Sequence, residues 1–399
     1  MDMASVSIGP MKLFCRAMVS KFQTIRSGLY PLWLIGANLS ARLGGMVILL
    51  IIGHSFASDV LGEYFKALAL IGLAITATQA GSGPLLVRLA QSRSFVKARF
   101  LVILRLVIAL FSTVLVIKYA AQPLGQFWPL MLMPFACALS PDWIVAAQTR
   151  FSRLGLIAVL GQVAGIMVAV WASVSQSPDA LYGIAPAISL ASLVFACLFA
   201  FKRTGNYSDL ILPARHGDNA IGLVGFTMLA GFLPNLDFVL MGAEEGTLFL
   251  AQRVFLLCAG LTAAIASTLF AKRQSGHLRD FWLLMPMASV SLMLFFWPEA
   301  LAKLIYGAPS DLLISVLQAG AAWPMLFALL TRQILILQEN TAVRLVGWIC
   351  LALAIITAFS IPNVGTATDV MVLIELRLAV LMVILFACQR YVITRQVTA

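Results

Sequence analysis

The chain has 399 residues, of which 61% are hydrophobic and only 11% are charged, and its mean hydropathy is +0.98. A soluble chain of this length would carry about 25% charged residues, so this composition indicates a polytopic membrane protein. The net charge of +11 could suggest a nucleic-acid partner, but the basic residues are spread over short connections and form no contiguous patch, which excludes that class.

Apolar segments follow one another along the chain, each long enough to cross a hydrocarbon core of about 30 Å. We expect them to be helices, because a helix satisfies every backbone hydrogen bond within itself. The fold class expected is therefore an all-α polytopic membrane protein with 12 transmembrane helices. The expected spans are 31–53, 63–87, 100–118, 126–148, 155–174, 180–201, 219–242, 247–271, 281–304, 313–337, 342–362 and 366–389.

A polar stretch at 203–218 contains Gly and Pro and separates six spans from six. We interpret it as a cytoplasmic linker between two lobes. The N-terminal six-helix lobe then covers 30–202 and the C-terminal six-helix lobe covers 219–390. A basic leader, 1–29, precedes the first lobe, and a cytoplasmic tail, 391–399, follows the second. The leader is either an amphipathic helix on the membrane surface or a disordered basic segment.

The second span of each lobe opens with a similar sequence. Gly62 begins the segment GEYFKA and Gly246 begins the segment GTLFLA, and each span then runs to a basic exit. This recurrence indicates a duplication in which the two lobes are related by an axis along the membrane normal. Such a parallel repeat is typical of transporters that work by alternating access.

The basic residues between the spans lie almost entirely on every second connection. Of the 27 Lys and Arg residues, 20 lie on one side and only Lys118 and Lys303 lie on the other. Because basic residues mark the cytoplasmic side, we expect both termini to be cytoplasmic. The 20 residues are Lys12, Arg16, Lys21, Arg26, Arg88, Arg93, Lys97, Arg99, Arg150, Arg153, Lys202, Arg203, Arg215, Lys272, Arg273, Arg279, Arg332, Arg344, Arg390 and Arg395.

The sequence contains no motif for a cofactor, a metal or a familiar enzyme. There is no G-x-x-x-x-G-K-[ST] loop for a nucleotide, no G-x-S-x-G and no H-E-x-x-H. The six cysteines form no C-x-x-C or Cys/His spacing. We therefore expect no cofactor and no metal, and the protein is not expected to be an enzyme.

Ionisable residues inside the spans are costly and usually functional. Arg42 and Arg377 lie too deep for comfortable snorkelling, whereas Lys66 and Arg105 lie near a membrane surface and could snorkel. Asp142 lies in the inner half of the fourth span.

The remaining intramembrane charges lie on three spans. Asp237 and Arg253 lie in the outer halves of the seventh and eighth spans, and Glu375 lies two residues before Arg377 on the twelfth. Two interpretations stay open: buried ion pairs between helices that lock the bundle, or a positively charged cavity for an anionic substrate.

Several short motifs resemble those of the Wzx-type polysaccharide flippases, in the multidrug/oligosaccharidyl-lipid/polysaccharide exporter superfamily. The second span has LGEYF at 61–65, AGSG at 80–83 and LVR at 86–88, and the seventh has NLD at 235–237 before LMG at 240–242. Gln148 with Arg150 and Phe151, and Gln338 before Arg344, resemble the exits of spans four and ten. Phe238 departs from the pattern, because many relatives have a basic residue there.

The resemblance implies a MATE/Wzx-like alternating-access transporter in the bacterial plasma (inner) membrane. Its substrate would be an undecaprenyl-diphosphate-linked oligosaccharide, moved from the inner to the outer leaflet for O-antigen, capsule or exopolysaccharide synthesis. The polyprenyl tail would stay in the membrane lipid, and a polymerase and a chain-length protein of the same pathway would be partners.

A diphosphate needs cations along its route, and Arg42, Lys66, Arg253 and Arg377 could supply them. Asp237 and Glu375 are candidate sites for coupling to H+ or Na+, since no nucleotide site is present to drive transport.

Two other functions stay open. A cation-coupled drug or metabolite antiporter of the same superfamily would have the same architecture, but acidic residues should dominate its cavity. A membrane-bound polysaccharide polymerase or ligase should have a large external loop, and all the external connections here are short.

Overall fold

The computed structural model describes residues 43–79, 82–92, 94–119, 127–148, 151–201, 236, 238–239, 246–271, 277–339, 352 and 366–398. Throughout this part of the chain the regular structure is helical and contains no strand. Within the same residues, seven helices are long and apolar enough to cross a membrane, or eight if one bent pair counts as a single span. The protein is therefore a multi-pass membrane protein.

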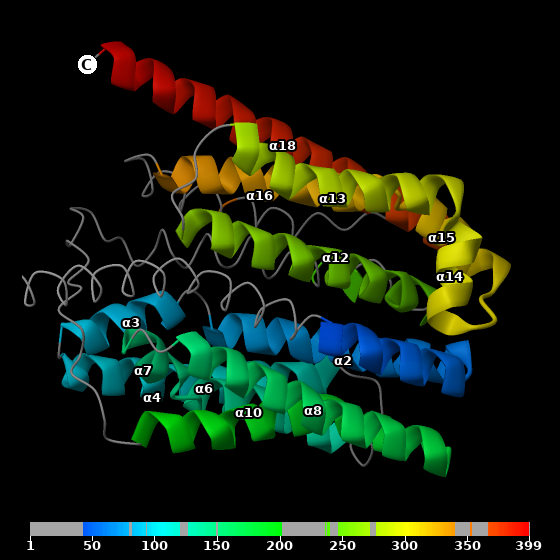
Figure 1. Ribbon diagram of the computed structural model, residues 1–399, viewed down its shortest axis with the longest axis horizontal. Helices are drawn as coiled ribbons and strands as arrows, with labels where there is room; N and C mark the ends of the chain where they lie inside the picture. The colour runs from blue at the N-terminus through cyan, green and yellow to red at the C-terminus, as the bar shows by residue number, and fades with distance from the viewer. Residues whose placement is uncertain are drawn as a thin grey trace, which may run out of the picture.

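The first half of the chain forms one group of helices (Figure 1). It begins with the helix Leu43–Ser55. The elements that follow are α2 (Ser58–Gln79), α3 (Ser82–Gln91), α4 (Phe95–Tyr119), η1 (Trp128–Met131), α6 (Leu132–Leu139), α7 (Asp142–Ala147), α8 (Phe151–Ser175), α9 (Pro178–Leu181) and α10 (Ile184–Phe201).

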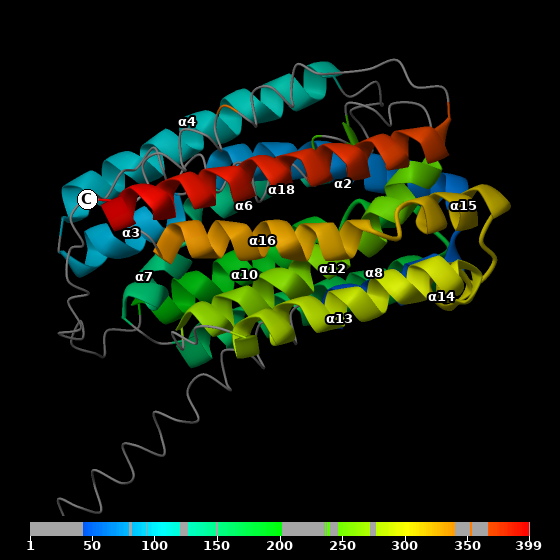
Figure 2. The ribbon, with the colours of Figure 1, turned by 90° about the horizontal axis from the view of Figure 1, so that it is seen from above.

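The second half of the chain forms another group, which lies beside the first (Figures 1 and 2). Its elements are α12 (Gly246–Ala271), α13 (His277–Phe296), α14 (Pro298–Tyr306), α15 (Asp311–Ala319), α16 (Trp323–Glu339) and α18 (Ala367–Thr398). The two groups correspond to the two lobes expected from the sequence. The linker 203–218 lies outside the described residues, so the lobe boundaries remain a prediction.

A large cluster of buried apolar side chains extends through both lobes, and α12 packs against α2 where they meet. The outward surface is apolar as well. On α4, Phe100, Val107 and Phe111 each expose more than half of their area. Large apolar side chains are unfavourable in water and favourable in hydrocarbon. This side of α4 therefore has the character of a surface that faces lipid.

Several expected spans are interrupted. The fourth divides into α6 and α7 at Ser140 and Pro141. The tenth divides into α15 and α16 at residues 320–322, just before Pro324. Proline lacks the N–H that would continue a helix, so it begins the second piece readily.

The ninth span does not run through residues 281–304 as expected. The helix α13 ends at Phe296, and α14 turns away from it by 98°. Pro298 stands at the start of α14 and cannot continue the hydrogen-bond pattern of α13. By contrast, Pro286 lies inside an uninterrupted α13.

Candidate functional site

The two lobes come into close backbone contact where α2 and α12 begin. A Cβ added to Gly62 would lie 2.6 Å from the Cα of Gly246, and one added to Gly246 would lie 3.0 Å from the Cα of Gly62. Only glycine permits two membrane helices to come this close. These two glycines open the repeated segments of the two lobes, so the repeat brings its own equivalent positions into contact at the predicted external end.

Arg253 joins the lobes near this contact. Its Nη2 donates a hydrogen bond of 2.9 Å to the carbonyl oxygen of Phe65 on α2. Its guanidinium carbon also lies 5.0 Å from the centroid of the Phe65 ring, which is a favourable cation–π distance. Its Nε is buried and makes no hydrogen bond among the described residues. In this conformation the Arg253 guanidinium holds the lobes together and keeps one donor unused.

Lys66 lies at the same level of the interface. It directly follows Phe65 on α2, and its side chain is half-buried. Of the predicted substrate-binding residues, Lys66 is therefore one residue along α2 from the carbonyl group that Arg253 contacts.

Glu375 has a different neighbour. Its Oε1 accepts a hydrogen bond of 2.8 Å from the backbone N of Trp323, the first residue of α16. The carboxylate of α18 thus caps the second piece of the interrupted tenth span, where a negative charge is favoured by the helix dipole. Arg377 follows two residues later on α18 and is half-buried, and residues two apart on a helix do not face each other.

Aromatic side chains connect this cap to α12. The Trp323 ring lies 5.3 Å from the ring of Phe255 on α12 and is stacked 4.9 Å from that of Phe327, centroid to centroid. Phe255 in turn lies 6.3 Å from Phe238. Trp323, whose backbone N bonds to Glu375, therefore packs against α12, the helix that carries Arg253.

The predicted site residues do not form a single cluster in the described part of the chain. Arg253 bonds to α2, whereas Glu375 bonds to α16. Arg42 and Asp237 lie outside the described residues, so their roles remain predictions. Within the described ranges no group of three or more His, Cys, Asp or Glu side chains is placed to hold a metal ion.

Two further charged contacts were not expected. Arg332 is one of the 20 basic residues on the predicted cytoplasmic side, yet it bonds to Asp280 at 2.7 Å and joins α16 to α13. Arg105 does not snorkel; it is only 5% exposed and lies within electrostatic range of Asp142 and Cys137 inside the N-terminal lobe. The sequence does not show which residues pair in either contact, because packing between different helices brings the partners together. Arg332 therefore forms a half-buried ion pair between helices, as in the first of the two interpretations given for intramembrane charges.

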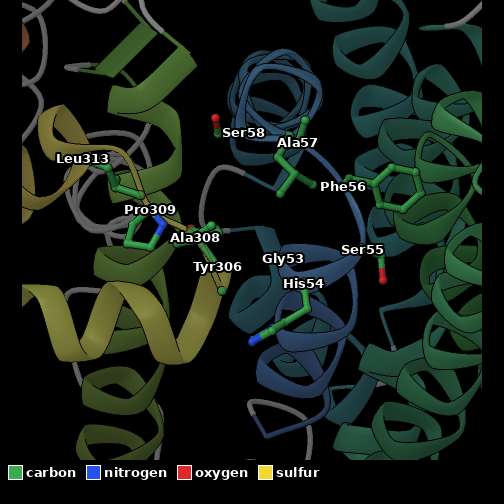
Figure 3. Close-up of a pocket in the computed structure, with 12 residues that line it drawn as sticks. Gly53, His54, Ser55, Phe56, Ala57, Ser58, Tyr306, Ala308, Pro309 and Leu313 are labelled. Atoms are coloured by element: carbon green, nitrogen blue, oxygen red, sulfur yellow. The ribbon is translucent and has the colours of Figure 1, made fainter.

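At the predicted external end a cavity of about 380 Å³ lies between the lobes. Figure 3 shows its two walls, one from residues 53–58 and the other from Tyr306, Ala308, Pro309 and Leu313. His54 lines this cavity and its side chain is exposed. Its Nδ1 lies 3.0 Å from the carbonyl oxygen of Leu50.

No protein-family model matches the chain, and no curated protein matches it in sequence. Solved structures do match. A MOP superfamily transporter from Pyrococcus furiosus is 15% identical, with a TM-score of 0.53, and the match covers 90% of this chain and 95% of that one. A mutant MATE transporter from Vibrio cholerae is 12% identical, with a TM-score of 0.55, and the match covers 91% and 95%.

The chain has the fold of the MATE transporters. A multidrug resistance MATE family transporter in an inward-facing conformation is another match, at 15% identity and a TM-score of 0.52, covering 91% of this chain and 94% of that one. Because each match covers nine-tenths of the chain or more, the MATE fold includes both lobes. At such low identity the likeness identifies the fold, and function is argued from the residues.

Proposed function

We propose that the protein is a flippase that moves an undecaprenyl-diphosphate-linked oligosaccharide from the inner to the outer leaflet of a bacterial plasma membrane. The observation behind this proposal is Arg253, a half-buried arginine between the two lobes of a MATE fold, whose buried Nε makes no hydrogen bond among the described residues. A fixed cation at the place where the lobes part favours an anionic cargo.

Arg253 also links cargo binding to opening. Its bond to the Phe65 carbonyl holds α12 on α2, so the lobes can separate only when that bond breaks. A diphosphate forms charge-assisted, two-pronged hydrogen bonds with arginine, and these are about twice as strong as bonds to a neutral carbonyl. The headgroup would therefore take the guanidinium from Phe65, with Lys66 on the same turn adding a second cation. Arg42 and Arg377 remain proposed further contacts along the route.

The acidic residues Glu375 and Asp237 are the proposed sites of coupling to H+ or Na+. Neutralising the Glu375 carboxylate would weaken its bond to Trp323 N and thereby loosen α16 from α18. The polyprenyl tail would remain in lipid, both termini would be cytoplasmic, and a polymerase and a chain-length protein would act on the exported unit.

Export in cells tests the role of Arg253. In cells that lack their own copy of the gene, we expect the Arg253→Ala protein to insert normally but to lower surface polysaccharide by about tenfold or more, the usual effect of losing a charged hydrogen bond. Arg253→Lys should restore export only in part, because an ammonium lacks the guanidinium fork. Arg390→Ala, an exposed arginine near the end of α18, is the matched control and should export normally. Normal export by Arg253→Ala would contradict the proposed role.

A cation-coupled drug antiporter is the second candidate, because one structural neighbour is a multidrug resistance MATE transporter and Glu375 offers a half-buried carboxylate. Purified protein in vesicles distinguishes the two functions. An antiporter would accumulate a fluorescent organic cation against a pH or sodium gradient, whereas the proposed flippase would not. A polymerase or ligase would instead lengthen or transfer the glycan, which a gel of the product would reveal.

A further inference from the structure

The short helix α14 leaves the line of its span and crosses the end of the bundle where the lobes meet (Figure 1). It has nine residues, and it begins after a bend of 98° at Trp297. It ends at Gly307, whose φ of +68° is the left-handed conformation that glycine adopts readily. With a rise of about 1.5 Å per residue, α14 is far too short to cross a membrane.

One side of α14 contacts the N-terminal lobe. A Cβ added to Gly53 would lie 2.3 Å from the carbonyl oxygen of Ile305, so the helix Leu43–Ser55 touches the backbone of α14 directly. A Cβ added to Gly307 would lie 3.2 Å from Cδ2 of His54. The last turn of α14 therefore rests on the last turn of the first described helix.

The same turn is fixed to the C-terminal lobe. The Tyr306 hydroxyl donates a buried hydrogen bond of 2.7 Å to the carbonyl oxygen of Leu250 on α12. Leu250 lies one turn before Arg253, so this bond and the Arg253 bond hold the same stretch of α12. On the opposite side of α14, Leu304 is 57% exposed, while Ile305 is 3% exposed. The buried side of α14 thus touches both lobes at once.

We propose that α14 is a strap that keeps the predicted external gate closed, with Tyr306 as the positioning residue that anchors it on α12. Anchoring Tyr306 sets Ile305 against Gly53, and this contact prevents the first helix from moving away from the C-terminal lobe. Opening toward the predicted external side would then require α14 to lift from Gly53. The inference concerns the gate and not the cargo, so its test needs no substrate and is independent of the proposed flippase activity.

The test uses a buried reporter at the gate. Leu61 lines the cavity between the lobes and is only 1% exposed. Leu61→Cys, in a full-length protein whose native cysteines are replaced by serine or alanine, would be reconstituted in lipid nanodiscs, and its rate of reaction with a maleimide would be measured. Adding Gly53→Ala should raise this rate by about tenfold or more, since backbone clashes of this kind usually cost that much. Gly45→Ala, on the same helix with no atom within 4 Å of the added Cβ, should leave the rate unchanged.

Tyr306→Phe provides a milder variant that keeps the ring and removes only the hydroxyl. We expect it to raise the Leu61→Cys rate by about fivefold, the usual effect of one lost hydrogen bond. A second reporter, Leu86→Cys, is fully buried within the N-terminal lobe and should stay unreactive. The proposal is overturned if Gly53→Ala and Tyr306→Phe react as slowly as Gly45→Ala, or if Leu86→Cys accelerates together with Leu61→Cys.

Discussion

Arg253 bonds to a carbonyl oxygen that lies 188 residues earlier in the chain, on the other lobe. The sequence placed this arginine inside a span and left two interpretations, an ion pair or a wet cavity. The structure shows a third arrangement, a backbone carbonyl together with an aromatic ring. Neither acceptor has a signature in the sequence, because every residue has a carbonyl group and Phe65 resembles any other apolar residue in the span.

Gly62 allows the same kind of long-range contact, and its substitution should push the lobes apart. In Gly62→Ala the new Cβ would collide with Gly246. We expect spin labels at Ser58 and Asp311, both exposed, to report a longer distance across the predicted external end. Gly83→Ala has open space around the added Cβ and is the control. Identical distance distributions in the two variants would contradict the close-contact role of Gly62.

Substitutions of Glu375 distinguish its role as a helix cap from its proposed role in ion coupling. Glu375→Gln retains a carbonyl acceptor for Trp323 N, whereas Glu375→Ala does not. We expect Glu375→Ala to lose about 1 kcal/mol of stability, seen as a lower Tm in detergent, and Glu375→Gln to lose less. If Glu375 couples transport to an ion, Glu375→Gln should also flip substrate without responding to a pH or sodium gradient. Retention of that response would leave Glu375 as a structural cap.

At the scale of helices, the sequence predicted where the chain is apolar better than where it bends. Pro286 and Pro324 look alike in sequence, yet α13 continues through the first and α16 begins just before the second. The difference is the neighbour: Glu375, 52 residues further along the chain, accepts from the free backbone N at Trp323. Such a partner cannot be predicted from the residues around a proline.

The contact between α13 and α16 should behave as a structural ion pair. Asp280 and Arg332 each keep only about a quarter of the side chain exposed, at 24% and 27%. Asp280→Asn and Arg332→Gln should each lower the Tm, and the double variant should be less destabilised than the sum, with a coupling energy of about 1 kcal/mol. Transport by the folded variants should be preserved. Additive effects in this double-mutant cycle would show that the pair contributes no mutual stabilisation.

At the scale of the whole molecule, the apolar helices of the described residues and the two-lobed fold were predictable, while the duplication stays a prediction. These features depend on composition along the chain, which a membrane constrains strongly. The G-x-x-F-x-A repeat even marked Gly62 and Gly246, although only the structure shows that these glycines touch. The cross-lobe contacts of α14 were not predictable, because they follow from a bend that the apolar pattern of residues 281–304 conceals.

The predicted orientation in the membrane has its own test. Single cysteines at Ser58, Ser177 and Thr366 should react with an impermeant thiol reagent on intact cells, because the basic connections lie on the other side. Ser92 is exposed directly after the end of α3, on the predicted cytoplasmic side. A cysteine there should react only after lysis. Reversal of these patterns would invert the assigned topology.

We propose that this MATE-fold protein flips an oligosaccharide on an anionic lipid carrier. The most direct measurement uses proteoliposomes that contain the purified protein and a fluorescent undecaprenyl-diphosphate oligosaccharide, with an added impermeant reagent that modifies only outer-leaflet sugar. Wild-type protein should make nearly all of the labelled lipid accessible, whereas vesicles without protein should stop at about half, because the label starts equally in both leaflets and lipid headgroups this polar do not cross unaided. Arg253→Ala should be much slower than wild type. Wild-type vesicles that also stop at the protein-free level, while the same protein transports an organic cation, would contradict the account.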